Sequence, residues 1–205
     1  MKLYVTTMAP NPDRVRYFLQ EKGVWDKVPR TDIGILKMEH KQPEYLALSP
    51  LNQVPCLELD DGTAITESRA ICTWFEGLYP EPNLMGVDAL ERARIEMWDR
   101  RVELLYFLPL GQWFRNTHPS MAELEKPQSP AWAEIVSGRV KKMAAFFDQR
   151  LGASPFLAGD RFTIADITLH VALGFGRIVK YRAWDDHKNL AAYRERLLSR
   201  PGLAS

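Results

Sequence analysis

The stretch VPCLELDDGTAITESRAI, residues 54–71, decides how this sequence is organised. Two short apolar runs, residues 56–59 and 63–66, flank Asp61-Gly62, a dipeptide that favours the positive φ angles of a tight hairpin turn. The pair Glu67-Ser68 then opens a segment with helical spacing of apolar residues. The stretch therefore predicts a β-hairpin that leads directly into a helix.

The same stretch also predicts a binding edge. A proline placed before a strand sets Val54 in an extended conformation, and a cis bond to Pro55 leaves the N–H and C=O of Val54 facing outward. Such groups pair an extended peptide as an additional strand. A helix N-terminus at Ser68 offers N–H groups to a carboxylate, and Glu67 can bind an ammonium group. A plain turn followed by a capped helix is the alternative interpretation.

The first 80 residues alternate short β-like runs with helical patterns. Residues 2–5 read as a strand, a helix follows and ends at Gly23, and residues 28–33 read weakly as a second strand. A short helix over residues 43–48 precedes the hairpin. The order βαβ, then ββα, indicates one small sheet with flanking helices. In the helix after the hairpin, apolar residues share one face: Ile71, Trp74, Phe75 and Leu78.

Strand signals disappear after the proline-rich linker of residues 81–87. Asp88 is the expected N-cap of a long helix that runs to about residue 110, and further helices are expected over residues 130–151 and 188–199. The segment 164–181 is apolar nearly all round, which is typical of the central helix of a bundle, and Thr163 and Asp166 stand at capping-box spacing at its start. The fold class predicted is α/β for the first part and an all-α bundle for the second.

Composition excludes several classes of function. With 27 basic and 26 acidic residues the net charge is +1, which argues against nucleic acid or an anionic membrane as the main partner. No apolar run approaches membrane-spanning length. The two cysteines, Cys56 and Cys72, have no metal-ligand spacing, so no metal is expected, and two isolated thiols are typical of a reducing cytoplasm.

Three motifs resemble one family, the glutathione transferases. VPCLELDDGTAITESRAI resembles the family's glutathione-binding signature, and GDRFTIADITL, residues 159–169, resembles its C-terminal signature. APNPDRVRYFLQEKG, residues 9–23, looks like the first helix of bacterial members. The resemblance implies a thioredoxin-like glutathione-binding domain over residues 1–80, a helical domain over residues 88–205 that contributes the electrophile pocket, and a homodimer.

The resemblance also implies a glutathione site in the hairpin region. Val54 would pair its backbone with the cysteinyl unit, and Pro55 would be the family's cis proline. Glu67 and Ser68 would hold the γ-glutamyl ammonium and carboxylate groups.

Other contacts are implied for the two ends of glutathione. His40 and Lys41, in the segment EHKQPEYL, would meet the glycine carboxylate, and Gln53 would add a hydrogen bond there. Asp99, in MWDRRVELL, matches an acidic residue that reaches across the dimer in many relatives, although a solvated helix face is the simpler interpretation.

The family's thiol activator is missing from this sequence. In VTTMAPNPDRVR, residues 5–16, the position that carries Tyr, Ser or Cys in many members falls on Ala9 or Pro10. Neither side chain donates a hydrogen bond to a thiolate. The candidate donors are Asn11, Thr7, the free N–H groups at the start of the helix, or a bound water.

A fungal class of the family also lacks the activator and resembles this chain. The segment of that class that positions a water resembles WFRNTHPS, residues 113–120, so Asn116, Thr117 and His118 are candidate water holders. Asn116 stands where the class has a histidine, and a surface loop histidine is an equal interpretation of His118. Candidates for an apolar electrophile pocket, which are more often core residues, are Phe107, Leu108, Trp113 and Phe114.

The function predicted is conjugation of the glutathione thiolate to hydrophobic electrophiles. Glutathione-dependent isomerisation, dehalogenation or peroxide reduction would use the same site. A glutathione-binding or scaffold protein without turnover is the alternative from another class.

Overall fold

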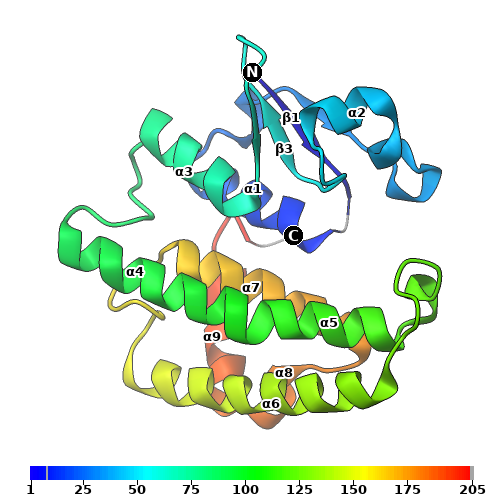
Figure 1. The fold of residues 1–205 in the computed structure, drawn as a ribbon. Helices are drawn as coiled ribbons and strands as arrows, with labels where there is room; N and C mark the ends of the chain where they lie inside the picture. The colour runs from blue at the N-terminus through cyan, green and yellow to red at the C-terminus, as the bar shows by residue number, and fades with distance from the viewer. Residues whose placement is uncertain (8, 204–205) are drawn as a thin grey trace. The chain divides into compact units, whose positions relative to one another are not determined.

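The chain folds into two compact units. The computed structural model describes residues 1–7 and 9–203 (Figure 1). Residues 1–83 together with 201–203 form the N-terminal unit, and residues 84–200 form the helical unit. All strands of the described chain lie in the first unit, and the second is built from helices. This division into a mixed α/β part and an all-α part confirms the predicted fold class.

The N-terminal unit has a four-stranded sheet in the order β2-β1-β3-β4. The β1–β2 pair is parallel and the other two pairs are antiparallel. Short 3₁₀ turns at Trp25–Lys27, Ile35–Lys37 and Glu39–Lys41 connect its elements. The regular elements are β1 (Lys2–Val5), α1 (Pro10–Glu21), β2 (Arg30–Asp32), α2 (Pro43–Leu48), β3 (Cys56–Glu58), β4 (Ala64–Thr66) and α3 (Ser68–Leu78).

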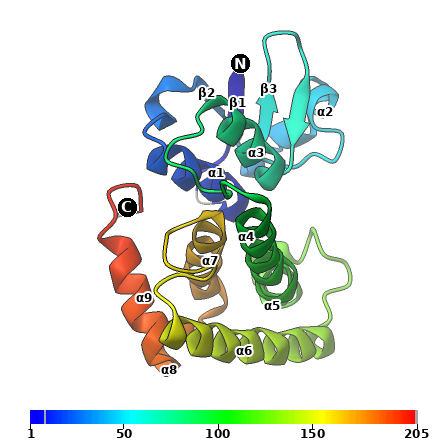
Figure 2. The same ribbon diagram turned by 90° about the vertical axis from the view of Figure 1, so that its left-hand side faces the viewer.

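The two faces of this sheet pack on different helices. Leu3 pairs with Leu57, and both are fully buried on the face covered by α1 and α3, which pack on each other (Figure 2). The next residues along these strands, Tyr4 and Cys56, point the other way because side chains alternate along a strand. They form a cluster with Tyr45 of α2.

Helix α3 buries only part of its apolar face. Ile71 and Phe75 are fully buried, whereas Trp74 and Leu78 are 37% and 43% exposed. The sequence places all four on one face, but the sheet and α1 cover only a narrower stripe of it.

A buried lysine ties the N-terminal unit together. The Lys22 ammonium, which follows the last turn of α1, lies 2.6 Å from a carboxylate oxygen of Glu76 on α3 and donates to the Pro82 carbonyl at 2.8 Å. Residues 201–203 belong to the same unit: Leu203 is fully buried, and a side chain at Gly202 would meet Glu21 at 2.9 Å.

The helical unit consists of long helices joined by short turns. Its elements are α4 (Ala89–Val102), a π-helical turn (Glu103–Phe107), α5 (Leu108–Thr117), a 3₁₀ turn (Pro119–Met121), α6 (Pro130–Ala153), α7 (Ile164–Phe175), a 3₁₀ turn (Gly176–Val179), α8 (Ala183–Asp186) and α9 (Lys188–Leu198). Asp88 caps α4 by accepting from the Glu91 N–H at 2.8 Å, as predicted. The expected long helix continues through the π-helical turn into α5, and that turn precedes Pro109, which has no N–H to donate.

Helix α7 is the buried centre of the helical unit, as its apolar sequence predicts. Thr163 and Asp166 form the expected capping box at its N-terminus. The fully buried carboxylate of Asp166 also accepts from the Leu157 N–H at 3.0 Å and from the Tyr193 hydroxyl at 2.8 Å. Burial raises the pKa of the Asp166 carboxyl, and these hydrogen bonds oppose that rise.

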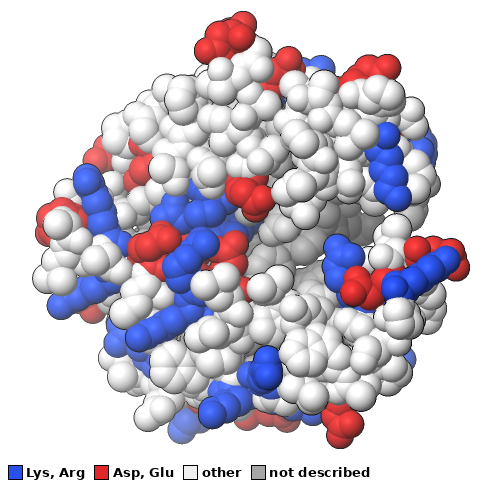
Figure 3. Space-filling model, in the orientation of Figure 1, with Lys and Arg blue, Asp and Glu red and all other residues white. Residues whose placement is uncertain are grey.

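Surface charge is mixed. On the face drawn in Figure 3, Lys and Arg side chains lie intermingled with Asp and Glu side chains. Among the residues that the structure describes, no helix has the length and apolar character needed to cross a membrane.

Two buried tyrosines of the helical unit should respond differently to loss of their hydroxyls. The Tyr193 hydroxyl donates to Asp166, whereas the Tyr106 hydroxyl is buried without a hydrogen-bond partner in the described chain. We expect Tyr193→Phe to lower the free energy of unfolding by about 1–3 kcal/mol, because it removes a hydrogen bond to a buried carboxylate. Tyr106→Phe should leave it unchanged or raise it by about 1 kcal/mol. Urea denaturation of both variants measures this, and equal losses would contradict the expectation.

Candidate functional site

The register of the hairpin brings the two predicted binding segments together. Cys56 pairs with Thr66 in the antiparallel β3–β4 ladder. One step beyond that pair, Pro55 stands opposite Glu67. The peptide bond between Val54 and Pro55 is cis. The end of β1 lies at the same edge, because Tyr4 pairs with Cys56. This edge of the sheet is the candidate site.

Glu67 has a rare backbone conformation. Its φ angle is 67° at the N-cap of α3, a region that non-glycine residues seldom occupy. The backbone turns there from β4 into α3 and leaves the Glu67 side chain exposed. Strained conformations of this kind persist where surrounding structure enforces them and are concentrated at functional sites. The exposed carboxylate at this bend is suited to bind a cation.

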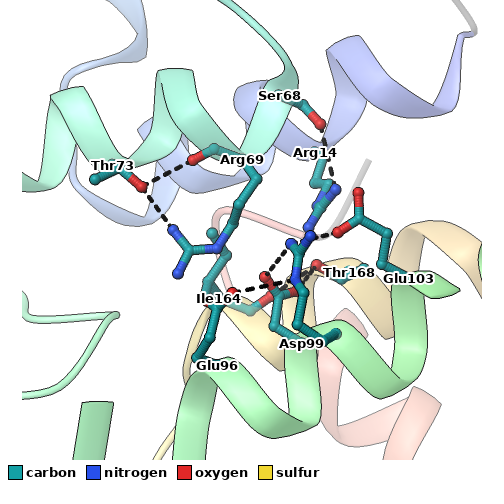
Figure 4. Close-up of polar contacts among 10 residues, drawn as sticks. Arg14, Ser68, Arg69, Thr73, Glu96, Asp99, Glu103, Ile164 and Thr168 are labelled. Atoms are coloured by element: carbon teal, nitrogen blue, oxygen red, sulfur yellow. Dashed lines mark hydrogen bonds and ion pairs between the residues drawn. The ribbon is translucent and has the colours of Figure 1, made fainter. Parts of the chain in front are cut away.

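Ser68 begins α3 and is supported by a buried arginine. Ser68 is 5% exposed, and its hydroxyl oxygen accepts from an Nη of Arg14 on α1 at 3.3 Å (Figure 4). Arg14 is fully buried. The first N–H groups of α3, the Ser68 hydroxyl and this positive charge all favour an anion at the same place. Arg14 could not be recognised from its local sequence, because a basic residue in an amphipathic helix ordinarily faces water.

Two buried hydroxyls hold the loop that presents Val54. The Gln53 carbonyl accepts from the Tyr45 hydroxyl at 2.7 Å and from the Ser49 hydroxyl at 2.9 Å. The Gln53 N–H in turn donates to the Ser49 oxygen at 3.2 Å. Burial raises the pKa of Tyr45, so its hydroxyl stays protonated and remains a donor. The Gln53 side chain is exposed and available to a ligand.

His40 and Lys41 lie in the 3₁₀ turn before α2. His40 is 7% exposed, and its Nδ1 atom is buried without a hydrogen-bond partner in the described chain. Burial, and then the nearby Lys41 ammonium, lower the pKa of His40. His40 is therefore neutral at neutral pH and can offer a hydrogen bond, while the exposed Lys41 carries the charge.

The turn after β1 sends Thr7 away from this edge. The Thr7 N–H and hydroxyl both donate to an Asp32 carboxylate oxygen, at 3.2 and 3.3 Å. Asp32 ends β2, and β1 lies between β2 and β3 in the sheet. The Thr7 hydroxyl thus points to the side opposite Val54. Met8 lies outside the described residues.

Asn11 contributes the main-chain donor at the start of α1. Pro10 and Pro12 have no N–H, and the Asp13 N–H donates to the Ala9 carbonyl at 3.1 Å. Among the described residues 10–13, Asn11 is the one whose backbone N–H is left as a donor. The Asn11 side chain is exposed, and Ala9 makes no side-chain cap.

The candidates expected in the helical unit have structural partners. Asn116 is buried; its amide nitrogen donates to the Gln112 carbonyl at 2.9 Å and its oxygen accepts from the Ser129 N–H at 2.8 Å. The Thr117 hydroxyl donates to the Trp113 carbonyl at 2.8 Å. These contacts tie the end of α5 to the start of α6. They use the polar atoms that sequence analysis assigned to a water.

His118 and Asp99 are also engaged within the helical unit. His118 caps the following 3₁₀ turn, with its Nδ1 atom 2.8 Å from the Ser120 hydroxyl. Asp99 is fully buried, and its carboxylate accepts from the Thr168 hydroxyl on α7 at 2.5 Å (Figure 4). This burial favours a role within the unit, and the cross-dimer contact of Asp99 stays a prediction.

Several predicted pocket residues meet in one aromatic cluster. Phe107 and Phe114 each lie edge-on to Phe175, with ring centroids 6.1 and 5.5 Å apart. Trp113 lies 5.8 Å from Tyr181. Phe107 is 8% exposed, while Phe114 and Trp113 are half-buried and present ring surface to a ligand. Phe175 and Tyr181 were not among the predicted pocket residues, because they lie in an apolar segment that predicts a buried central helix.

Both cysteines are buried and neither forms a disulfide. Burial raises the pKa of the Cys56 thiol to about 11, so it is not a nucleophile at neutral pH. Among the described residues no group of three or more His, Cys, Asp and Glu side chains is placed to hold a metal ion.

Two family models match the chain. The N-terminal domain model of glutathione S-transferases matches residues 9–78, and the C-terminal domain model matches residues 112–201. Glutathione S-transferase 2 of Saccharomyces cerevisiae is 36% identical over 99% of this chain and 88% of its own length. Maleylacetoacetate isomerase of Pseudomonas aeruginosa is 39% identical over 93% of this chain and 89% of its own length.

Solved structures agree with the sequence relatives. The crystal structure of Gtt2 from Saccharomyces cerevisiae superimposes with a TM-score of 0.93 at 36% identity, covering 100% of this chain and 99% of that one. A glutathione S-transferase domain-containing protein of Marinobacter aquaeolei gives 0.94 at 37% identity, covering 99% of this chain and 100% of that one. Together with the two domain models, these matches show that the chain belongs to the glutathione S-transferase family.

Proposed function

We propose that this chain conjugates the glutathione thiolate to hydrophobic electrophiles. The observation that carries the proposal is the hairpin register: the β3–β4 ladder ends at the Cys56–Thr66 pair, which Val54-Pro55 directly precede and Glu67-Ser68 directly follow in the chain. That edge offers an unpaired strand, a carboxylate and a helix N-terminus at once. These are the groups that recognise the backbone, the ammonium and the carboxylate of one small peptide.

Glutathione lies along this edge in the proposed complex. Its cysteinyl unit pairs with the Val54 backbone, and its γ-glutamyl carboxylate binds at Ser68, where the buried Arg14 adds positive charge. Glu67 binds the γ-glutamyl ammonium. At the other end the glycine carboxylate meets the Lys41 ammonium and accepts hydrogen bonds from neutral His40 and the Gln53 amide.

The thiol is activated by the backbone N–H of Asn11 in this proposal. An ordinary thiol has a pKa near 8.5, and lowering it by two units needs about 2.7 kcal/mol of preferential anion stabilisation. One main-chain hydrogen bond together with the N-terminal end of the α1 dipole supplies energy of that order. Thr7 is not proposed as the donor, because Asp32 accepts from its hydroxyl.

The electrophile binds to the helical domain in this proposal. The roles proposed for the domains are those expected from the sequence. Residues 1–80 bind glutathione, residues 81–87 form the linker, and residues 88–205 supply the electrophile pocket. The half-buried rings of Trp113 and Phe114 provide the apolar surface for it.

A second candidate function is glutathione-dependent isomerisation. It is favoured by the 39% identity to a protein named maleylacetoacetate isomerase. The same thiolate would add to the substrate and leave again, so the glutathione site is unchanged and only the acceptor differs. Parallel assays with a chloronitrobenzene acceptor and with a cis-enone diacid separate the two. Tight glutathione binding without turnover of either would favour a scaffold protein.

We further propose a homodimer in a reducing cytoplasm. Apolar side chains remain exposed on both units, including Trp74 and Leu78 of α3 and Leu104 and Leu105 of the π-helical turn. A second copy of the chain is the proposed cover for these residues. Two cysteines that form no disulfide agree with a reducing compartment.

Loss of the Glu67 charge should weaken glutathione binding. We expect Glu67→Gln to raise the Kd for glutathione about 10- to 100-fold, because the γ-glutamyl ammonium loses a charge-assisted hydrogen bond. Glu44→Gln is the matched control, since Glu44 is also exposed but lies on α2, outside the β3–β4 hairpin and the start of α3. Isothermal titration calorimetry measures both. Equal affinity of the Glu67 and Glu44 variants would refute the proposed site.

Two substitutions at Asn11 distinguish the effect of its side chain on the thiol pKa from the effect of its backbone N–H. Asn11→Ala keeps the N–H, whereas Asn11→Pro removes it at a helix position where proline is tolerated. We expect the pKa of bound glutathione, followed by thiolate absorption in the ultraviolet, to rise by about one unit only in Asn11→Pro. A rise in both variants would assign the side chain. No rise in either, with thermal melts confirming folded protein, would assign a water.

The neutral state of His40 predicts a loss of stability in acid. Because the pKa of His40 is lowered in the folded chain, the unfolded chain binds this proton first. The stability contribution is therefore complete above the unfolded value of about 6.5 and falls as the pH drops through the folded pKa. Urea denaturation of the wild type and of His40→Gln from neutral to acid pH measures this. The free energy of unfolding of His40→Gln should fall less steeply with decreasing pH than that of the wild type. The same dependence on pH in both proteins would contradict the prediction.

A further inference from the structure

The N-terminal unit contains a pocket that the proposed glutathione site does not use. The pocket has a volume of about 370 Å³, within the range of small-molecule sites. It lies at the carboxyl end of β1, beside α1 and the 3₁₀ turn at Trp25–Lys27. Its lining residues are Val5, Thr6, Thr7, Pro12, Asp13, Arg16 and Trp25.

This pocket lies on the other side of β1 from the hairpin edge. In the sheet β1 separates β2 from β3, and Pro55 and Glu67 belong to the β3–β4 side. The pocket residue Thr7 is bonded to Asp32 of β2. None of Val54, Glu67 and Ser68 therefore lines the pocket. Crevices beyond the carboxyl ends of parallel strands, here β1 and β2, are where α/β sheets bind ligands.

An aromatic ring forms one wall of the pocket. Trp25 is half-buried, and the Arg30 guanidinium lies 4.1 Å from its ring centroid. Arg30 is not one of the residues that line the pocket. Val5 and Pro12 supply further apolar surface. A flat ring that stacks on Trp25 gains both burial and an aromatic contact.

The charged residues of the wall cancel each other. The Arg16 Nε atom lies 3.0 Å from an Asp13 carboxylate oxygen, with about a quarter of each side chain exposed. Because this pair already satisfies its own charge, a charged ligand gains little there and still loses its hydration. We propose that this pocket is a second binding site, for an uncharged planar aromatic molecule.

Indole is the probe that tests the site. We expect indole to bind the full-length protein with one site per chain and a Kd of roughly millimolar order, as its small size allows. Isothermal titration calorimetry measures the affinity with and without saturating S-methylglutathione, which should not displace indole. Indole-3-carboxylate, which adds a charge to the same ring system, should bind at least about tenfold more weakly.

Two variants place the bound indole. Trp25→Ala removes the stacking wall and Thr6→Phe fills the pocket while Trp25 stays, so each should weaken indole binding by about tenfold or more. Trp132→Ala is the matched control. The Trp132 ring also has an arginine over it, Arg139, at 5.2 Å from the ring centroid, but Trp132 lies on α6 of the helical unit. It should leave indole binding unchanged. Thermal melts verify that each variant is folded.

Several results would overturn the proposal. These are no binding of indole, full competition by S-methylglutathione, or wild-type affinity in folded Thr6→Phe. None of them bears on the glutathione site, whose test is the affinity of Glu67→Gln for glutathione. The two proposals therefore fail independently.

Discussion

The pairing of β3 with β4 is the constraint on which the candidate site depends. The ladder ends at the pair of Cys56 and Thr66, so the segments next to that pair, Val54-Pro55 and Glu67-Ser68, leave the sheet at the same end. A shift of one residue would turn Leu57 from the face covered by α1 and α3 to the face that packs on α2. It would also separate the two predicted binding segments. Core packing on one face and the site at the edge thus enforce the same register.

Buried charge is used in two different ways in the two units. In the helical unit, Asp166 and Asp99 are enclosed by hydrogen-bond donors that hold α7 in place. In the N-terminal unit, Arg14 is equally buried, but its Ser68 partner lies at the edge where a ligand carboxylate is proposed. The Arg14 guanidinium thus lies directly behind the Ser68 hydroxyl at the start of α3.

Some residues of the candidate site can be recognised from their neighbours in the sequence, and others cannot. The position of Glu67 and Ser68 at the start of α3 was predictable, because it follows from a short segment: a turn dipeptide, a strand and a helix start. Arg14, Ser49 and Tyr45 were not, because each acts through a partner distant in the sequence or through a backbone carbonyl. For Asn116 and His118 the motif was local, but the structure engages their polar atoms in the connection between α5 and α6.

The sequence by itself determined the order of strands and helices, the capping of α4 and α7, and the hairpin edge. These features depend on hydrophobic period, turn residues and caps, which are properties of a few neighbouring residues. Tertiary structure alone decided that Thr7 turns toward Asp32, that His40 is buried and neutral, and that Trp74 and Leu78 remain exposed. The physical reason is that the direction of a side chain and the cost of its charge depend on which distant elements surround it. No local pattern in the sequence records those neighbours.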